Sequence, residues 1–275
     1  MLERLTLLES EIDSSPKIID PHDKTIGSMH SHEDAPKESG CYHYLRSHES
    51  KPHYIETGIT ESFSIHNRLD DSGFCIKSTR DASQHFSKSQ ITTWAYYSNL
   101  SESFANPKQV DLLANLPQAG SVISCRYYLR SNQLCVHRKV NSEPLQVFDY
   151  PYRSDLLILP LMRCFLGPLI YRVSKSERGT SEMVVPDIRD PVSSQFALPL
   201  FEKRRAHVLQ QRENNMIIDS QDRCAKAYSF VGGNYDDNSI FWLDRSSKLL
   251  LCYDYKAPNG EKWRTRLKNH RSESI

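Results

Sequence analysis

The chain has 275 residues, 38% of them hydrophobic and 25% charged, and its 35 basic and 34 acidic side chains give a formal net charge of +1. A balanced charge creates no global field that attracts nucleic acid or an anionic membrane, so neither is predicted as a partner. The hydrophobic share is below that of a typical globular domain, which predicts that part of the chain lies outside one main core.

Three patterns along the chain bear on its location. The longest hydrophobic run, residues 156–169, contains Pro160, Arg163 and Gly167 and is shorter than the roughly 20 apolar residues of a spanning helix, so no membrane span is predicted. The first segment, MLERLTLLESEIDSS, places acids between its apolar residues, which is typical of a short amphipathic helix and not of a signal peptide. Seven scattered cysteines without a CxxC pair favour free thiols, and we therefore expect a cytoplasmic protein.

The N-terminal part of the chain differs in texture from the rest. Residues 14–53 are rich in Ser, His, Pro and charged side chains and show no periodicity, which is typical of a mobile segment. Many of the eleven histidines lie there, but Cys41, His43, His48 and His53 do not match the ligand spacing of a structural zinc site, so no metal is predicted. We expect an N-terminal segment over residues 1–53 and a folded domain over residues 54–275.

From Tyr54 onward, β-branched and aromatic runs alternate with short polar turns, which predicts a meander of antiparallel strands. The runs SVISCRYYLR and QLCVHRKV predict a hairpin with a two-residue turn. Pairing across that turn places Arg126 opposite His137 on one face and Tyr127 opposite Val136 on the other.

Two helices are expected within this meander. Asn106-Pro107 is a typical start for a short helix over KQVDLLANLP. Ser154-Asp155 can cap a second helix through LLILPLMRCFLG, which Gly167-Pro168 would end. The second helix is apolar on every side and should therefore be buried.

These elements predict a mainly β (or α+β) fold, in which a curved antiparallel sheet or half-barrel packs against a buried apolar helix. The segments DYPYRSDLLILPLMRCFLG and SIFWLDRSSKLLLCYDYK carry a resemblance of layout. Their order is similar to that of the lipocalin-like half-barrels of periplasmic lipoprotein carriers, and of the cofactor-free violacein-pathway enzyme that rearranges an indole intermediate with this fold. The resemblance implies that the concave face of the sheet and the helix hold an apolar ligand.

Sequence motifs for cofactor chemistry are missing from the chain. It has no G-x-S-x-G, HExxH, P-loop or GxGxxG pattern, so no cofactor is predicted. Gly232-Gly233 is better interpreted as a turn or bulge. The cysteines inside apolar runs, such as Cys125 and Cys252, are interpreted as small hydrophobic side chains of the core.

The best catalytic candidates are Arg126, His137, Asp149 and Arg153, on the hairpin and just before the apolar helix. An arginine can bind a carboxylate through two hydrogen bonds, while His or Asp can move a proton near neutral pH. The alternative is a solvated sheet face with an exposed loop, because antiparallel sheets commonly have one wet face.

Aromatic candidates for ligand binding accompany this group. They are Tyr128, Tyr150, Tyr152, Trp242 and Tyr253. A second polar group, Glu202, Arg204, Arg205 and His207, has the same solvated alternative. Residues 263–268 alternate between side chains suited to a buried face and basic side chains. This pattern indicates an edge strand and not a surface that stacks nucleic-acid bases.

The leading functional hypothesis is a protein that binds an apolar or aromatic small metabolite, as a cofactor-independent biosynthetic enzyme that catalyses isomerisation, cyclisation or rearrangement. The alternative is a noncatalytic carrier of small molecules or lipids, or an interaction module that uses its His-rich N-terminal arm. The two differ in the pocket, since an enzyme needs converging polar groups with shifted pKa and a carrier does not. Whether the chain forms a homodimer is left open by the sequence.

Overall fold

In the computed structural model the chain is described over residues 35–48, 51–67, 73–85, 88–98, 106–233, 239–256 and 260–272. The first eight strands are β1 (Glu38–His48), β2 (Lys51–Asn67), β3 (Phe74–Asp81), β4 (Gln90–Tyr97), β5 (Gln109–Leu116), β6 (Ser121–Arg130), β7 (Gln133–Val140) and β8 (Gln146–Pro151). The other strands are β9 (Leu157–Ile158), β10 (Thr180–Pro186), β11 (Pro199–Ile218), β12 (Gln221–Val231), β13 (Ile240–Asp244), β14 (Leu250–Lys256) and β15 (Lys262–Ser272). The helical elements of the described part are η1 (Pro117–Ala119) and α2 (Arg163–Lys175).

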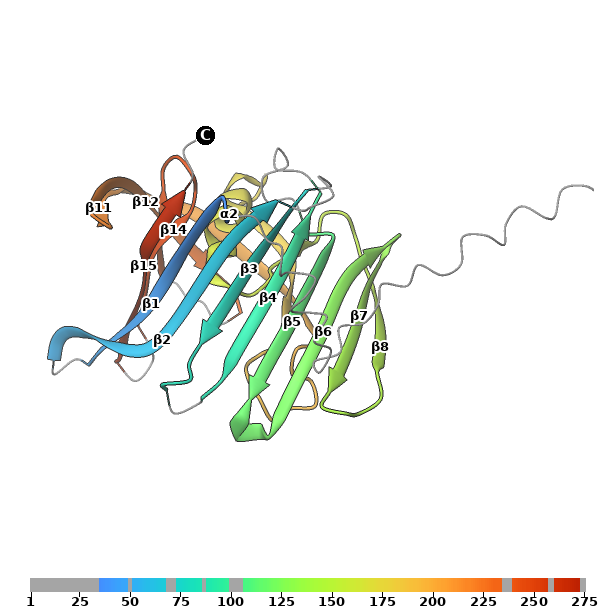
Figure 1. The fold of residues 1–275 in the computed structure, drawn as a ribbon. Coiled ribbons are helices and arrows are strands. Elements are labelled where there is room, and N and C mark those ends of the chain that lie inside the picture. The colour runs from blue at the N-terminus through green and yellow to red at the C-terminus, as the bar shows by residue number, and fades with distance from the viewer. Residues whose placement is uncertain are drawn as a thin grey trace, which may run out of the picture.

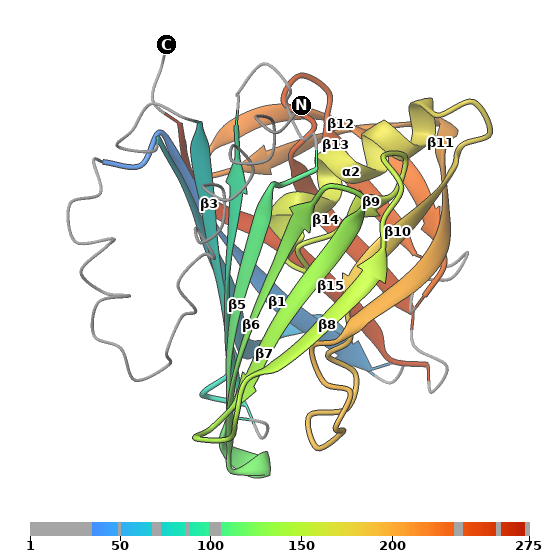
Figure 2. The same ribbon diagram turned by 90° about the vertical axis from the view of Figure 1, so that its right-hand side faces the viewer.

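All fifteen strands belong to one strongly curved sheet, in the order β8-β7-β6-β5-β4-β3-β2-β1-β15-β14-β13-β12-β11-β10-β9. The strands from β1 to β8 form one antiparallel meander and those from β10 to β15 form another, and the pairing of β1 with β15 joins the two (Figure 1). The sheet curls around α2 into a barrel-like shape, which Figure 2 shows from the side. The predicted mainly β fold with a helix against a curved sheet is confirmed.

The core lies on the concave face of this sheet. Ile76 and Leu112 of the first meander and Phe241 of the second belong to one buried cluster, together with Leu166 and Ile170 of α2. Because both meanders point side chains into the same core, we call this the inner face and the opposite one the outer face.

The apolar helix exists, but it begins and ends later than predicted. The segment after Asp155 is extended through β9, and α2 runs from Arg163 to Lys175 with Gly167 and Pro168 inside it. A Cβ on Gly167 would lie 2.6 Å from the backbone nitrogen of Leu250, so this glycine lets α2 approach the turn before β14 and does not end the helix.

The helix predicted over KQVDLLANLP is instead strand β5. Val110, Leu112 and Ala114 are buried on the inner face, and this two-residue period outweighs the capping signal. Asn106 does not cap a helix. Its side chain accepts a hydrogen bond from the Ile158 backbone (2.9 Å) and donates one to the Tyr152 hydroxyl (2.7 Å), which fixes β9.

Two strands differ from what the sequence predicted. Strand β1 falls within the expected N-terminal segment, yet it pairs with β2 and β15 and buries Tyr42 completely. The sheet therefore begins before the predicted domain boundary at residue 54. Strand β15 alternates as predicted, with Thr265 and Leu267 buried, but it pairs on both sides and is not an edge.

A loop between β10 and β11 turns back into the lower end of the barrel (Figure 2). Its Ala197 carbonyl accepts hydrogen bonds from the Tyr127 hydroxyl and from the Cys125 thiol, and its Phe196 carbonyl accepts one from Arg138 (2.9 Å). These contacts attach the loop to the inner face of β6 and β7.

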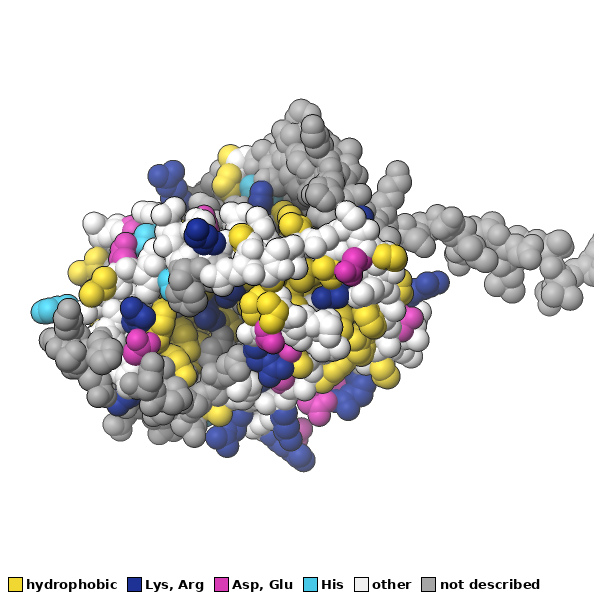
Figure 3. All heavy atoms as spheres, turned by 90° about the horizontal axis from the view of Figure 1, so that it is seen from below, with side chains coloured by type: hydrophobic (Ala, Val, Ile, Leu, Met, Phe, Trp, Pro, Cys, Tyr) yellow, Lys and Arg dark blue, Asp and Glu magenta, His cyan; other side chains and the backbone are white. Residues whose placement is uncertain are grey.

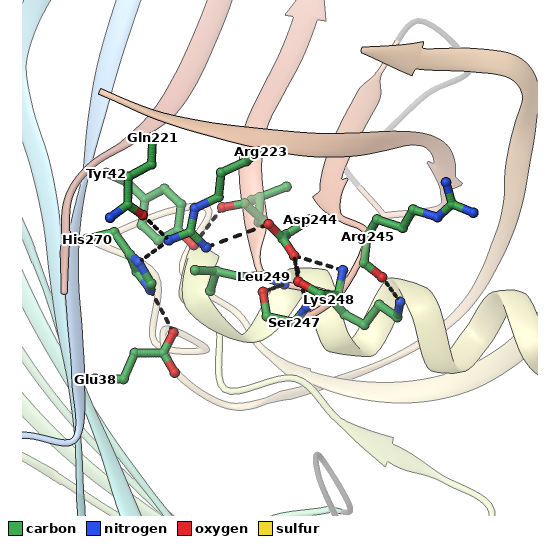
Figure 4. Close-up of polar contacts among 12 residues, drawn as sticks. Glu38, Tyr42, Gln221, Arg223, Asp244, Arg245, Ser247, Lys248, Leu249 and His270 are labelled. Atoms are coloured by element: carbon green, nitrogen blue, oxygen red, sulfur yellow. Dashed lines mark hydrogen bonds and ion pairs between the residues drawn. The ribbon is translucent and has the colours of Figure 1, made fainter. Parts of the chain in front are cut away.

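A polar network ties the long β11–β12 hairpin to the junction of β1 and β15 (Figure 4). Arg223 donates to Nδ1 of His270 (3.0 Å), so the other ring nitrogen of His270 carries the proton that is donated to Glu38 (2.8 Å). Arg223 also lies 3.6 Å from Asp244, whose carboxylate accepts backbone hydrogen bonds in the β13–β14 turn. The network thus stabilises the junction between the two meanders.

Within the described part of the chain, no helix has the length and hydrophobicity that crossing a membrane would require.

Candidate functional site

A cavity of about 440 Å³ lies inside the barrel and is called the luminal cavity here. The sheet contributes Tyr44, Ile59, Glu61, Arg80, Val185, Pro186, Leu200, Glu202, Arg204, Tyr253, Tyr255, Trp263 and Thr265. The segment leading into α2, the first residue of α2 and the loop after β10 contribute Leu159, Leu161, Arg163, Asp187, Ile188 and Arg189. Its size falls within the range of small-molecule sites, which is about 300–1,000 Å³. Figure 3 looks onto the lower end of the molecule, where the surface is hollowed between hydrophobic side chains.

Strand alternation explains why these side chains meet. Glu61 is two residues from Phe63 on β2, and Arg80 is two residues from Ser78 on β3, so both lie on the inner face with the core. Tyr253 and Tyr255 share the inner face of β14 in the same way. Polar groups therefore enter the lumen on rigid strands.

Glu61 occupies the centre of the polar wall and is 1% exposed. One carboxylate oxygen accepts a hydrogen bond from the Tyr44 hydroxyl (3.0 Å), and the other accepts the backbone N–H of Arg163, the first residue of α2. Burial raises the pKa of the Glu61 carboxyl above its ordinary value, although the nearby Arg163 opposes the shift. Glu61, which lies on β2, thus caps the N-terminus of α2 and holds a proton more readily than an exposed glutamate.

Arg163 turns its side chain toward the cavity. Its guanidinium lies 5.7 Å from the ring centre of Tyr44 and 5.2 Å from that of Tyr253, which are cation–π distances. Just before it, Leu161 has φ 78°, a left-handed conformation that is costly for a branched residue. This strained turn places Leu161 and Arg163 on the cavity wall.

Glu202 and Arg204 form an ion pair on the inner face of β11. Arg204 is 4% exposed, donates through Nε to Glu202 (2.9 Å) and lies over the ring of Phe230. A Cβ on Gly233 would lie 2.6 Å from the Arg204 guanidinium, and the φ of Gly233 is 57°. Gly232-Gly233 therefore forms a turn, as predicted, and leaves room for this pair.

Two further features complete the polar lining. Asp187 and Arg189 form a double hydrogen bond at the rim (2.9 and 2.7 Å), and this contact lowers the pKa of the Asp187 carboxyl. Arg80 is half-buried in the wall and lies opposite Glu61 on the neighbouring strand, with which it interacts electrostatically. Within the described part of the chain it makes no hydrogen bond or direct ion pair.

The predicted pairing of Arg126 with His137 is confirmed, but both lie on the outer face. Their neighbours Tyr127 and Val136 belong to the core, so the side chains of Arg126 and His137 point away from the helix. Arg126 donates to both carboxylate oxygens of Asp111 (2.7 and 3.1 Å).

His137 meets another aromatic residue on that face. Its Nε2 lies 3.1 Å from the Tyr128 hydroxyl, and burial together with Arg126 lowers the pKa of its imidazole. We call Asp111, Arg126, Tyr128 and His137 the outer-face cluster. It does not line the luminal cavity.

The other predicted site residues are dispersed. Asp149 is exposed on the outer face of β8, opposite Cys135, and Arg153 is exposed and pairs with Asp155 and Glu182. Tyr150 packs beside Phe201, and the Tyr152 hydroxyl donates to the Leu156 carbonyl. Trp242 alternates with the core residues of β13. Of the residues predicted to bind ligand, Tyr253 lies in the luminal cavity.

The second polar group of the sequence splits between the two faces of β11. Glu202 and Arg204 line the cavity, whereas Arg205 and His207 are exposed on the other face. Glu61, Arg80 and Arg163 were missed, because alternation shows which side chains of a strand share a face but not which face lines the cavity, and Arg163 lies at the start of α2.

All seven cysteines are free and form no disulfide. Burial raises the pKa of the Cys125 and Cys252 thiols to about 12, which suits packing better than nucleophilic chemistry. Among the described residues no cluster of three or more His, Cys, Asp or Glu could hold a metal ion, and His43 instead lies 3.5 Å from Glu56. His22, His30 and His32 lie outside the described residues.

No protein-family model matches the sequence, and no curated protein is significantly similar to it. Among solved structures, the chain is similar to a β-barrel-like protein of domain of unknown function DUF1849 from Brucella abortus, with a TM-score of 0.50, 8% identity, and coverage of 87% of this chain and 99% of that one. A second match, at 11% identity and covering 91% and 92% of the two chains, is an outer membrane lipoprotein-sorting protein domain from Vibrio parahaemolyticus. Its TM-score of 0.24 is too low to support a shared fold. The first likeness places this chain in the β-barrel-like fold class.

Proposed function

We propose that the protein binds a small amphipathic molecule in the luminal cavity. The observation that carries this proposal is the composition of the cavity wall, where apolar side chains such as Leu159, Ile188 and Trp263 surround a few fixed polar groups. Binding sites for small molecules are mostly apolar and use a small number of placed polar groups for orientation. Such a site serves a carrier or an enzyme equally well.

The test is to fill the cavity without changing the outer surface. Leu200 lines the cavity, whereas Ile217, on the same strand β11, is 62% exposed. Leu200→Trp should lower the affinity for the neutral fluorescent probe N-phenyl-1-naphthylamine at least tenfold, because the indole occupies the probe's space. Ile217→Trp should bind the probe like the wild type.

Thermal unfolding of both variants, followed by circular dichroism, verifies that each is folded at the binding temperature. Equal probe affinity of folded Leu200→Trp and Ile217→Trp would contradict luminal binding. Native mass spectrometry of the purified wild-type protein would show whether a molecule already occupies the cavity.

A catalytic role is the second candidate, and Glu61 is the observation that favours it. A buried carboxyl with a raised pKa, hydrogen-bonded to the Tyr44 hydroxyl beside an apolar cavity, can serve as a general acid without a cofactor. This fits isomerisation, cyclisation or rearrangement of a bound metabolite. Its test compares molecules recovered from the wild type and from Glu61→Gln. Accumulation of a different molecule on the variant supports turnover, and identical molecules support a carrier.

The thiols suggest where the protein acts. All seven cysteines are free, as expected in a reducing compartment. We therefore propose a cytoplasmic location, which fractionation of the native cells would test.

A further inference from the structure

The polar groups of the luminal cavity differ in whether they have hydrogen-bond partners within the protein. Glu61 accepts hydrogen bonds from Tyr44 and from the start of α2, and Glu202 accepts them from Arg204. Each carboxylate thus has its partners within the protein. Arg80 faces the same cavity and, among the described residues, has neither a hydrogen bond nor an ion pair.

The charges of the wall are also unbalanced. Arg80, Arg163 and Arg204 face the two carboxylates Glu61 and Glu202, while Asp187 and Arg189 neutralise each other at the rim. A cation that is partly removed from water without a partner is unfavourable, and an anion placed beside it relieves that cost. Glu61 lies opposite Arg80 across the β2–β3 pair and interacts electrostatically with both Arg80 and Arg163, so these three groups keep one surplus positive charge. The Arg80 guanidinium is the one that faces the cavity without a hydrogen bond to a described residue.

The surroundings of Arg80 select the kind of anion. A planar guanidinium pairs with a carboxylate through two parallel hydrogen bonds. Apolar side chains, among them Ile59, Leu159 and Trp263, supply a wall for a hydrocarbon body. One surplus cation matches one negative charge.

From this arrangement we infer that the luminal cavity selects amphipathic monocarboxylates, with the carboxylate on Arg80 and the apolar body along the opposite wall. The inference rests on the proposed function and adds the chemical class of the ligand. A neutral ligand of the same length leaves the Arg80 guanidinium without a hydrogen-bonded anion, so the cavity should discriminate against it.

The experiment compares decanoate with decanol by titration calorimetry at pH 8, where decanoate is ionised. The wild type should bind decanoate about 10- to 100-fold more tightly, which is the effect of a hydrogen bond to a charged group. Arg80→Gln should bind decanoate only as tightly as decanol and should leave decanol binding unchanged.

Lys77→Gln is the matched control. Lys77 lies on the same strand β3 but on the outer face, opposite Trp94. Lys77→Gln removes the same charge from the protein as Arg80→Gln. A loss of the preference for decanoate in this variant would therefore attribute the preference to general electrostatics and overturn the inference. Circular dichroism verifies that both variants are folded.

Two other outcomes separate the inference from the proposed function. Equal binding of decanoate and decanol by the wild type would overturn carboxylate selection while leaving luminal binding intact. Binding of neither ligand, together with unchanged probe affinity of Leu200→Trp, would overturn both.

Discussion

The luminal cavity and the outer-face cluster use the same residue types, yet they differ in how their charges are satisfied. In the outer-face cluster, Arg126 and Asp111 bind each other through two hydrogen bonds, and Asp111 is 1% exposed. In the cavity, Arg80 lies opposite Glu61 on the neighbouring strand but makes no hydrogen bond to it or to another described residue. A group of Arg, His and Asp that looks catalytic can therefore be held together by its own hydrogen bonds. An arginine that faces a cavity without a hydrogen bond is the better sign of a ligand site.

The largest expected effect comes from removing the strand that joins the two meanders and lines the cavity. A chain that begins at residue 51 lacks β1, which pairs with β2 and β15 and contributes Tyr44 to the cavity. Its loss exposes the core and two strand edges, so we expect no cooperative thermal unfolding and no binding of the neutral probe. The outer-face cluster lies on β5–β7, away from β1.

A chain that begins at Ala35 is the control, because it keeps every described strand. It should unfold cooperatively. A cooperative transition in the chain that begins at residue 51 would contradict the importance of β1.

The second prediction concerns the outer-face pair. Arg126→Ala removes the arginine beside the buried Asp111 carboxylate, to which Gln109 still donates (2.9 Å), and should cost about 3–5 kcal/mol in the free energy of unfolding by urea. The neutral probe should still bind to the folded fraction, because Arg126 faces away from the cavity.

Arg130→Ala is the control for this prediction, since Arg130 is exposed at the end of the same strand and its loss should change stability by less than about 0.5 kcal/mol. Replacing both partners, Asp111→Leu with Arg126→Met, should recover much of the lost stability. A loss of probe binding in folded Arg126→Ala would instead connect the two regions.

The smallest effect is a pH dependence that originates inside the cavity. Burial raises the pKa of Glu61, so its contribution to stability is full below the unfolded-state pKa of about 4.5 and is lost as the pH rises through the folded-state value. Glu61→Gln does not titrate. Its stability relative to the wild type should therefore increase from pH 4 to pH 8 in urea unfolding.

Glu56→Gln should show the opposite trend. The contact with Lys268 lowers the pKa of Glu56, so the wild-type glutamate stabilises the fold above about pH 4.5 and loses that contribution as the pH falls. Parallel pH profiles of the two variants would contradict the assignment of Glu61 as a buried acid.

Local signals predicted the fold where one turn fixes the register. The β6–β7 hairpin follows from its two-residue turn and alternating pattern. The start of α2 could not be predicted in this way, because its capping group is Glu61 from a distant strand. Strand β5 was misassigned because a local capping signal at Asn106-Pro107 was weighted above the alternation of Val110 and Leu112.

The candidate site was predictable only in part, for a geometric reason. Alternation tells which residues of a strand share a face, and it correctly grouped Arg126 with His137. Which face becomes concave depends on how fifteen strands curl around α2, and no single strand carries that information. Arg80 and Glu61 could be identified only once the inner face was known.

The curved sheet ends at β8 on one side and β9 on the other, and these two edge strands are not paired with each other in the described structure. Side chains cross this seam from β8 and the residues after it to β10 and β11, through the Tyr150–Phe201 ring contact and the exposed Arg153–Glu182 ion pair. A barrel closed by backbone hydrogen bonds has a fixed circumference, set by strand number and stagger. A seam held by side chains can widen by a few exchanged contacts, so the girth of this barrel can adjust to its contents, and chain length should be a weaker criterion for ligand choice than charge.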